Sequence, residues 1–255
     1  MPVADFSLRG KVAIVTGGSR GIGRSIAIGL AEAGADVCVA ARKPEALEEA
    51  VAAVRATGRK GIAVPTNVRE MAGLQNLVDE TRKQLGRVDI LVNNAATNPV
   101  FGPVINNDER AFDAVMNTNI KSLFFLSKMV REVIKEQGDG GSIINISSTG
   151  GLRASGGLGL YSVSKAAVIM LTQVCAKEWG VDGIRVNCIA PGLIKTEFSR
   201  ALWDNEAAAR GATQGNPLRR IGEADEMAGA AVYFASAASS FTTGQTLVLD
   251  GGGTA

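Results

Sequence analysis

The sequence contains no histidine, and this absence narrows the chemistry open to it. Among 255 residues there is no imidazole to act as a general base, to complete a Ser-His-Asp triad or to ligate zinc through nitrogen. Proton transfer must therefore use Tyr, Lys, Asp, Glu or Cys side chains. The sequence also shows no group of residues with metal-ligand spacing, so we expect no metal site.

Cysteine is scarce as well. The three cysteines, Cys38, Cys175 and Cys188, are odd in number, far apart and without a Cys-x-x-Cys pair. Neither a disulfide framework nor a zinc site fits this pattern. We expect all three to be small core residues in a reducing cytosol.

Long apolar runs, signal-peptide features and a strong charge imbalance are missing too. We find no apolar run long enough to span a bilayer, and the first ten residues carry Asp5 and Arg9 instead of an apolar stretch. The net charge is +2 with both signs interspersed, which disfavours a nucleic-acid-binding surface. The sequence therefore predicts a cytoplasmic protein with no nucleic-acid or membrane partner.

Short apolar segments alternate with longer amphipathic ones from end to end. The chain, 46% hydrophobic, suffices for one large domain over residues 1–255. Strands are predicted at 12–16, 37–41, 61–65, 90–93, 142–147, 185–189 and 246–249. Helices are predicted at 22–33, 45–57, 74–85, 112–135, 161–178 and 224–235. This alternation indicates an α/β, doubly wound Rossmann-type three-layer sandwich, whose parallel sheet binds ligands at the carboxyl ends of its strands.

Residues 193–222 form the one long stretch without clear strand character. We expect a mobile flap there, with short helical pieces, over the substrate site. Phe198 and Trp203 lie on it, and either form a lid over an apolar substrate or are ordinary packing residues. The glycine-rich stretch 149–160 offers three leucines that hint at an apolar lining: Leu152, Leu158 and Leu160.

A glycine-rich loop at residues 16–23 joins the first predicted strand to the first helix. Gly17, Gly21 and Gly23 allow a tight turn and a close backbone approach to a pyrophosphate, and the helix N-terminus supplies free N–H groups. The spacing G-x-x-x-G-x-G differs from the standard G-x-G-x-x-G, so a turn without a ligand is the alternative. The loop also matches the hydrolase motif G-x-S-x-G through Ser19, but a chain without histidine disfavours a hydrolase.

Positive charge follows the second predicted strand, at the place where NAD-binding sequences carry an acid. Arg42 and Lys43 stand there, and Arg20 in the glycine loop adds a third cation. Because a guanidinium fork can bind a 2′-phosphate, the sequence predicts NADP(H), with NAD(H) less favoured. The alternative is that Arg42 only caps a solvated loop.

Tyr161 and Lys165 lie four residues apart in a predicted helix and so share one face. A free tyrosine has a pKa of about 10 and is a poor base at neutrality, but a neighbouring ammonium is expected to lower that pKa. In a chain without histidine, this pair is the main candidate for general acid–base chemistry.

Three further motifs follow predicted strands: Asn93-Asn94-Ala95-Ala96, Asn145-Ile146-Ser147-Ser148 and Pro191-Gly192. Together with the glycine loop and the Tyr-Lys pair, in this order, they resemble the short-chain dehydrogenase/reductase family over nearly the whole chain. The resemblance is closest to 3-oxoacyl-carrier-protein reductase-like carbonyl reductases. It implies a seven-stranded sheet of order 3-2-1-4-5-6-7 and an NADP(H)-dependent oxidoreductase acting on a carbonyl or secondary alcohol, including one bound to an acyl carrier.

The resemblance also implies site residues. Ser148 would bind the substrate oxygen, Tyr161 would be the general acid or base beside Lys165, and Asn119 would hold a proton-relay water to Lys165. Ser147 and Asn117 are the rivals for two of these roles. The implied cofactor-binding residues are Gly17, Ser19, Arg20, Gly21, Ile22, Gly23, Arg42, Lys43, Asn67, Val68, Asn94, Ala95, Ala96, Tyr161, Lys165, Pro191, Gly192, Ile194 and Thr196.

Two predictions concern partners and activity. The predicted helices 112–135 and 161–178 carry apolar residues on more than one face, and family members bury such faces in homotetramers. Packing within one subunit is the alternative. A non-catalytic nicotinamide-binding scaffold or sensor on the same fold is the alternative to an enzyme.

Overall fold

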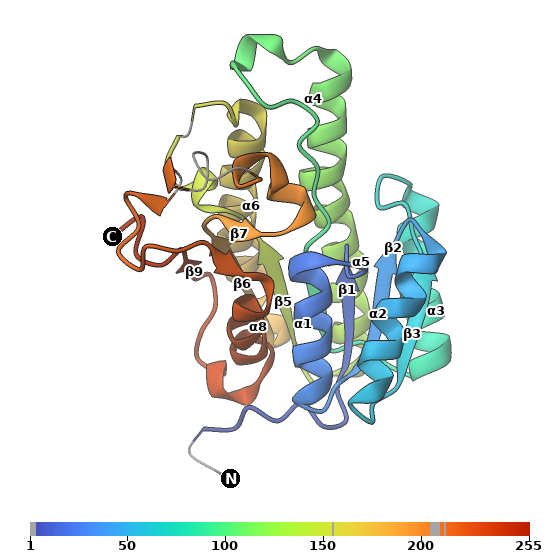
Figure 1. Cartoon of the computed structure of the whole chain (residues 1–255). Helices are drawn as coiled ribbons and strands as arrows, with labels where there is room; N and C mark the ends of the chain where they lie inside the picture. Colours follow the sequence, from blue (N-terminus) through green and yellow to red (C-terminus); the bar gives the residue numbers. More distant parts are fainter. Residues whose placement is uncertain (1–3, 155, 205–209, 212) are drawn as a thin grey trace.

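A seven-stranded parallel sheet forms the middle layer of the molecule (Figure 1). The computed structural model describes residues 4–154, 156–204, 210–211 and 213–255. The strands are β1 (Val12–Thr16), β2 (Asp36–Ala41), β3 (Gly61–Pro65), β4 (Ile90–Asn93), β5 (Gly141–Ile146), β6 (Ile184–Pro191) and β9 (Thr246–Leu249). Their order, β3-β2-β1-β4-β5-β6-β9, confirms the predicted order, because β9 is the seventh strand of this sheet.

Helices cover both faces of the sheet. On one face lie α1 (Gly21–Glu32), α2 (Pro44–Ala56) and α8 (Ala228–Ala235), and on the other α3 (Met71–Leu85), α5 (Ser122–Gln137) and α6 (Gly159–Trp179). Side chains of a strand alternate between the two cores: Val37 and Val39 face the first, Cys38 and Ala40 the second. Burial on both faces explains why these strands are almost uninterruptedly apolar.

The predicted helix 112–135 consists of three segments in the structure. These are α4 (Glu109–Met116), the π-helical turn η2 (Asn117–Lys121) and α5. The carboxylate of Asp108 caps α4 by accepting a hydrogen bond from Ala111 N at 2.8 Å. A π-turn inside an α-helix is a local widening that often marks a functional position, and here it carries Asn119.

The stretch 193–222 contains strands that the sequence did not predict. β7 (Ile194–Lys195) pairs in parallel with β8 (Gly222–Glu223), and the 3-10 segment η5 (Glu197–Leu202) follows β7. A strand of two residues is too short to show an alternating pattern. The small sheet ties the two ends of the expected flap together, while residues 205–209 and 212 lie outside the described residues.

The segment Gly159–Asp182 corrects the expectation that no apolar run is long enough to cross a membrane, because its length and composition would allow it. In the fold it comprises α6 and the 3-10 turn η4 (Gly180–Asp182), and α6 packs against β5 and β6. Ser164, Lys165 and Thr172 are among its buried residues. A core helix can therefore meet the same length and composition as a membrane span. The three cysteines are free and buried, as predicted.

Candidate active site

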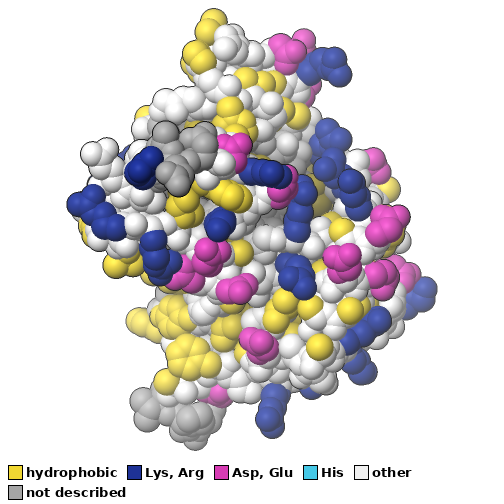
Figure 2. Space-filling view, in the orientation of Figure 1, with side chains coloured by type: hydrophobic (Ala, Val, Ile, Leu, Met, Phe, Trp, Pro, Cys, Tyr) yellow, Lys and Arg dark blue, Asp and Glu magenta, His cyan; other side chains and the backbone are white. Residues whose placement is uncertain are grey.

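A cleft of about 1570 Å³ opens at the carboxyl ends of the strands. Every predicted cofactor-binding residue lines it, and so does Ser148. Asn119 does not line it but lies buried behind the wall. In Figure 2, Lys and Arg side chains border the hollow in this face of the molecule. The structure thus brings both predicted sets of residues to one edge of the sheet.

The glycine loop after β1 is held open by packing that leaves no room for side chains. Gly17 has φ +63°, a left-handed conformation that favours glycine. A Cβ on Gly23 would lie 2.4 Å from Asn94 Nδ2 and 2.4 Å from Gly17 O. The Asn94 amide donates hydrogen bonds to Thr16 O at 2.9 Å and Gly17 O at 3.1 Å, so Asn94 supports the loop as well as lining the cleft.

Cations gather where the cleft passes the end of β2. Arg20, Arg42 and Lys43 are exposed, line the cleft and form no ion pair with any described residue. Arg69, which follows β3, lines it too and was not predicted. This end of the cleft therefore presents uncompensated positive charge, suited to a phosphate group.

Tyr161, Ser148 and Lys165 meet at the other end of the same cleft. Tyr161 and Ser148 both line the cleft, and the Ser148 side chain partly offsets the rise in the pKa of the Tyr161 hydroxyl. The ammonium of Lys165 lies 5.5 Å from the centroid of the Tyr161 ring and donates a hydrogen bond to Ile146 O at 2.7 Å. Tyr161 comes from the first turn of α6, and Ser148 from the residues that follow β5.

The protonation of this pair differs from the sequence-based expectation. Burial raises the pKa of Tyr161 to about 12, with only a partial offset from its hydrogen bond to Ser148. Burial also lowers the pKa of Lys165 to about 8. The prediction that Lys165 lowers the tyrosine pKa was wrong for this structure, because desolvation is the dominant effect and the ammonium bonds to Ile146 O instead. Tyr161 is therefore protonated at neutral pH.

The two neighbouring serines have different partners. Ser147 is buried, and its hydroxyl donates to Lys165 O at 2.7 Å, which fixes α6 to the end of β5. The Ser148 hydroxyl accepts from Gly150 N at 3.1 Å, and Ser148 lines the cleft. Ser148 is therefore the better placed of the two rivals to contact a substrate.

Asn119 is embedded in a network that leads to the tyrosine. Its Oδ1 accepts from Thr97 N at 2.8 Å, and its Nδ2 donates to Thr97 O at 3.1 Å and to Ser164 Oγ at 2.9 Å. Ser164 in turn donates to Tyr161 O at 2.7 Å. Asn119 is 1% exposed and its rival Asn117 is partly exposed, so the buried network belongs to Asn119.

The two aromatic residues of the expected flap differ in their position relative to the cleft. Phe198 lines the cleft, and its ring centroid lies 5.9 Å from that of Tyr161. Trp203 does not line it; its indole N–H donates to Ser199 Oγ at 3.0 Å. Of the three leucines in 149–160, only Leu158 lines the cleft.

Several residues in or near the cleft were not singled out by sequence reasoning. The buried Ser164 donates to Tyr161 O without lining the cleft. Asn98 and Arg153, close to predicted motifs, and Asp250 and Thr254, which follow β9, line it. A signal did exist for the last two, because β9 ends at the same sheet edge as the other parallel strands. Ser164 could have been found from its position three residues after Tyr161 on one helix face.

Comparison with known proteins agrees with this geometry. Residues 17–254 match the family model described as Enoyl-(Acyl carrier protein) reductase. The chain is 39% identical over 245 residues to Dehydrogenase/reductase SDR family member 4 of Oryctolagus cuniculus, covering 96% of this chain and 94% of the relative. The chain belongs to the short-chain dehydrogenase/reductase family. It is therefore an oxidoreductase of the dehydrogenase/reductase type.

Two solved structures show the same architecture. A gluconate 5-dehydrogenase from Burkholderia cenocepacia J2315, in complex with NADP and tartrate, is 37% identical with a TM-score of 0.93, and 98% of each chain is covered. A 7α-hydroxysteroid dehydrogenase complexed with NADH and 7-oxo glycochenodeoxycholic acid is 33% identical with a TM-score of 0.94, covering 99% of this chain and 97% of that one. The two proteins share the fold but were captured with different nicotinamide dinucleotides and different second molecules.

Proposed function

We propose that this short-chain dehydrogenase/reductase transfers a hydride between NADP(H) and a carbonyl or secondary alcohol, with Tyr161 as the general acid and base. The observation that carries the proposal is the pairing of the Tyr161 and Ser148 side chains, with the buried Lys165 ammonium 5.5 Å from the centroid of the Tyr161 ring. This donor pair lies in the same cleft as the glycine loop. The arrangement offers two hydrogen bonds to one substrate oxygen beside a dinucleotide cradle.

The residues present fit a dinucleotide. The glycine loop would receive the pyrophosphate, because a Cβ on Gly23 would fill the turn and the N-terminus of α1 presents backbone N–H groups. Arg42, Lys43 and Arg20 would receive a 2′-phosphate. Relatives have been captured with NADP and with NADH, so the proposal for NADP(H) rests on these cations.

The protein's own groups account for the proton. The bound nicotinamide would supply or accept the hydride. Ser148 and Tyr161 would hold the substrate oxygen, and Tyr161, protonated at neutral pH, would donate its phenolic proton when that oxygen gains charge. Lys165 would then favour the phenolate electrostatically, and Asn119 would position a water that returns the proton.

Replacing Tyr161 tests the proposal. Tyr161→Phe should lose nearly all turnover of a ketone panel, about a thousandfold in kcat, while NADPH binding measured by fluorescence persists. The only other tyrosine, Tyr233, bonds to Thr242 Oγ1 and does not line the cleft, so Tyr233→Phe is the matched control. Retention of more than about a tenth of wild-type kcat would show that Tyr161 is not the acid. Equal or better kcat/KM with NADH would refute the NADP(H) preference.

We further propose a cytoplasmic homotetramer. Phe112, Phe124, Val163, Met170 and Val174 are exposed apolar side chains on α4, α5 and α6, which supports burial of these helices between subunits. The three free, buried cysteines fit a reducing compartment. Light scattering at micromolar concentration would test the tetramer.

A further inference from the structure

The part of the cleft beyond Ser148 and Tyr161 is built from segments far apart in the sequence. Its walls come from the stretches after β4 and β5, from η5 and from the residues after β9. We call this part the substrate end; it is lined by Phe101, Arg153, Leu158, Phe198, Asp250 and Thr254. Most of these side chains are apolar or neutral, so the charged ones decide what chemistry the substrate end attracts.

Arg153 stands on a compact turn that begins at Ser148. Gly151 N donates to Ser148 O at 2.9 Å, and Arg153 N donates to Thr149 O at 3.0 Å. These bonds fix the backbone of Arg153 close to Ser148, and both residues line the same cleft.

The guanidinium of Arg153 has no acidic partner among the described residues. Its only hydrogen bond there is from Nη2 to the backbone oxygen of Thr254, at 2.5 Å. A neutral carbonyl engages one of the five N–H donors that a guanidinium carries. A cation with most of its donors free, facing the cleft, is suited to an anionic group that can take two of them at once.

The other cations around this end are already engaged. Arg220 forms two hydrogen bonds with the carboxylate of Glu226, at 2.6 and 2.7 Å. The ammonium of Lys195 lies 5.5 Å from the centroid of the Trp203 ring. Arg153 therefore differs from both in having neither a carboxylate nor a ring as its partner in the described structure.

The acids of the substrate end do not cancel this charge. Glu197 pairs with Arg200 at 3.6 Å. Asp250 accepts a hydrogen bond from Gly252 N at its Oδ1, and its Oδ2 is buried without a hydrogen-bond partner among the described residues. Neither carboxylate is engaged by Arg153, so the positive charge of Arg153 stays available to a substrate.

From this charge balance we infer that the substrate carries a carboxylate, which Arg153 binds while Ser148 and Tyr161 hold the reacting oxygen. This inference rests on the proposed function of the site. The substrate class is an oxo acid, or the corresponding hydroxy acid, in which several bonds separate the reacting carbon from the carboxylate. A planar carboxylate matches the guanidinium fork, and a single cation neutralises its single charge.

Pairs of oxo acids and their methyl esters, of increasing chain length, test the inference with NADPH and the full-length chain. In the wild type, one acid of the series should exceed its ester in kcat/KM. In Arg153→Met the acid should lose roughly ten- to a hundredfold in kcat/KM, the range expected for a charge-assisted hydrogen bond, while the ester is unchanged. Arg153→Lys keeps the charge without the fork and should fall between. Arg110→Met, an exposed cation that does not line the cleft, is the matched control.

Each contrary outcome leads to a different conclusion. An ester as good as its acid throughout the wild-type series would overturn the inference. An equal loss for acid and ester in Arg153→Met would show that Arg153 only fixes the segment around Thr254. If no ketone is reduced at all, the proposed function fails instead, and calorimetric titration of the same acids into wild type and Arg153→Met still decides whether Arg153 binds the carboxylate.

Discussion

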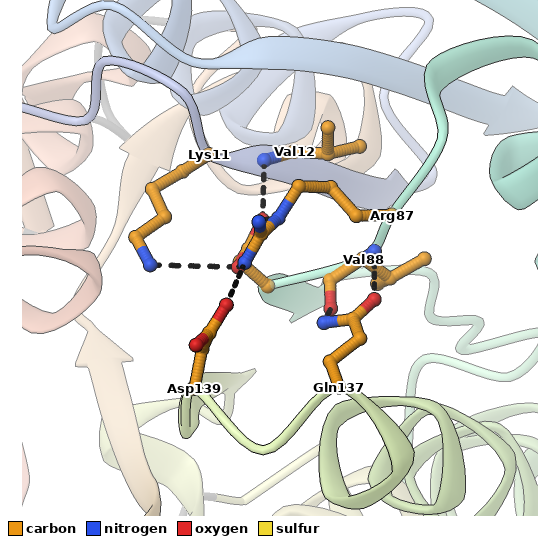
Figure 3. Close-up of polar contacts among 7 residues, drawn as sticks. Lys11, Val12, Arg87, Val88, Gln137 and Asp139 are labelled. Atoms are coloured by element: carbon orange, nitrogen blue, oxygen red, sulfur yellow. Dashed lines mark hydrogen bonds and ion pairs between the residues drawn. The ribbon is translucent and has the colours of Figure 1, made fainter.

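Polar side chains at the amino ends of the strands have different partners from those at the carboxyl ends. At the amino ends of β1 and β4, hydrogen bonds and ion pairs join charged and amide groups from three stretches of the chain, 11–12, 87–89 and 137–139 (Figure 3). At the carboxyl ends, Arg20, Arg42, Lys43 and Arg153 form no ion pair with any described residue, and Lys165 is buried against a backbone carbonyl. The first end stabilises the fold, while the second keeps groups in states that favour ligand binding and proton transfer at the expense of stability.

The network at the amino ends is centred on Asp89. Its carboxylate is buried and accepts from Val12 N at 2.9 Å, from Arg87 Nε at 2.8 Å and from Arg87 Nη2 at 2.6 Å. Arg87 also bonds Asp139 at 2.9 Å, and these bonds raise its pKa. Lys11 adds an ion pair at 3.5 Å. Every oxygen of the buried carboxylate thus has partners, which is the condition for burying charge without a large penalty.

The largest effect is expected from removing the charge at the carboxyl end, with Lys165→Met. Turnover should fall about a thousandfold, as for loss of a general acid–base component. The free energy of unfolding, in contrast, should rise in Lys165→Met. Because folding lowers the lysine pKa from 10.5 to about 8, the buried charge destabilises the wild type below pH 8, and wild-type stability rises between pH 8 and 10.5 as the folded state loses its proton first.

Lys165→Met should therefore raise the unfolding free energy at pH 7 by up to about 3 kcal/mol, and this gain should shrink above pH 8. Denaturant unfolding at pH 7 and pH 9.5 measures both values. Lys128→Met, an exposed lysine on α5, is the control. A variant less stable than the wild type at pH 7 would show that Lys165 is stabilised, not destabilised, in its buried position.

The next effect is expected at the amino end, with Asp89→Ala. Loss of the buried carboxylate leaves Val12 N and Arg87 without their acceptor, and unfolding free energy should fall by about 3 kcal/mol. The kcat of the folded fraction should be unchanged, since the site lies at the other edge of the sheet. Asp139→Ala removes a largely exposed partner of Arg87 and should lower stability by less than about 1 kcal/mol. A loss of kcat in folded Asp89→Ala would mean that the two ends are coupled.

The sequence predicted the regular part of the fold because each strand is a buried apolar segment. β1, β3, β4 and β9 have the predicted bounds, and the other strands differ by one or two residues. The pair β7 and β8 was not predicted, because two residues show no period and their pairing joins positions 194 and 222. The π-turn at Asn119 was not predicted either, because a single wider turn does not disturb a helical apolar pattern.

The site was predictable where a motif is local and not where it depends on burial. The Tyr161–Lys165 spacing places both side chains on one helix face, and the structure brings them together with Ser148. The direction of the Tyr161 pKa shift was predicted wrongly, because the degree of desolvation comes from segments distant in sequence. Arg153 belongs to no sequence motif, and its lack of an acidic partner among the described residues is visible only in the structure, where it donates to Thr254 O.

The smallest effects are expected from removing one buried hydroxyl at the carboxyl end of the sheet or one side-chain amide at the amino end. Ser164→Ala removes the acceptor of Asn119 Nδ2 and the donor to Tyr161 O, while Gln137→Ala removes two hydrogen bonds with the backbone of Val88, at 2.8 and 2.9 Å. Each change should lower the unfolding free energy by about 1 to 2 kcal/mol. Only Ser164→Ala should also lower kcat, by several-fold, with the KM for NADPH unchanged, because Ser164 positions Tyr161 without touching the cofactor. Ser164→Thr keeps the hydroxyl and should restore kcat if its extra methyl is accommodated. If Gln137→Ala lowers kcat equally, the loss reflects general loosening of the fold, and the distinction between a stabilising and a reactive end of the sheet does not hold.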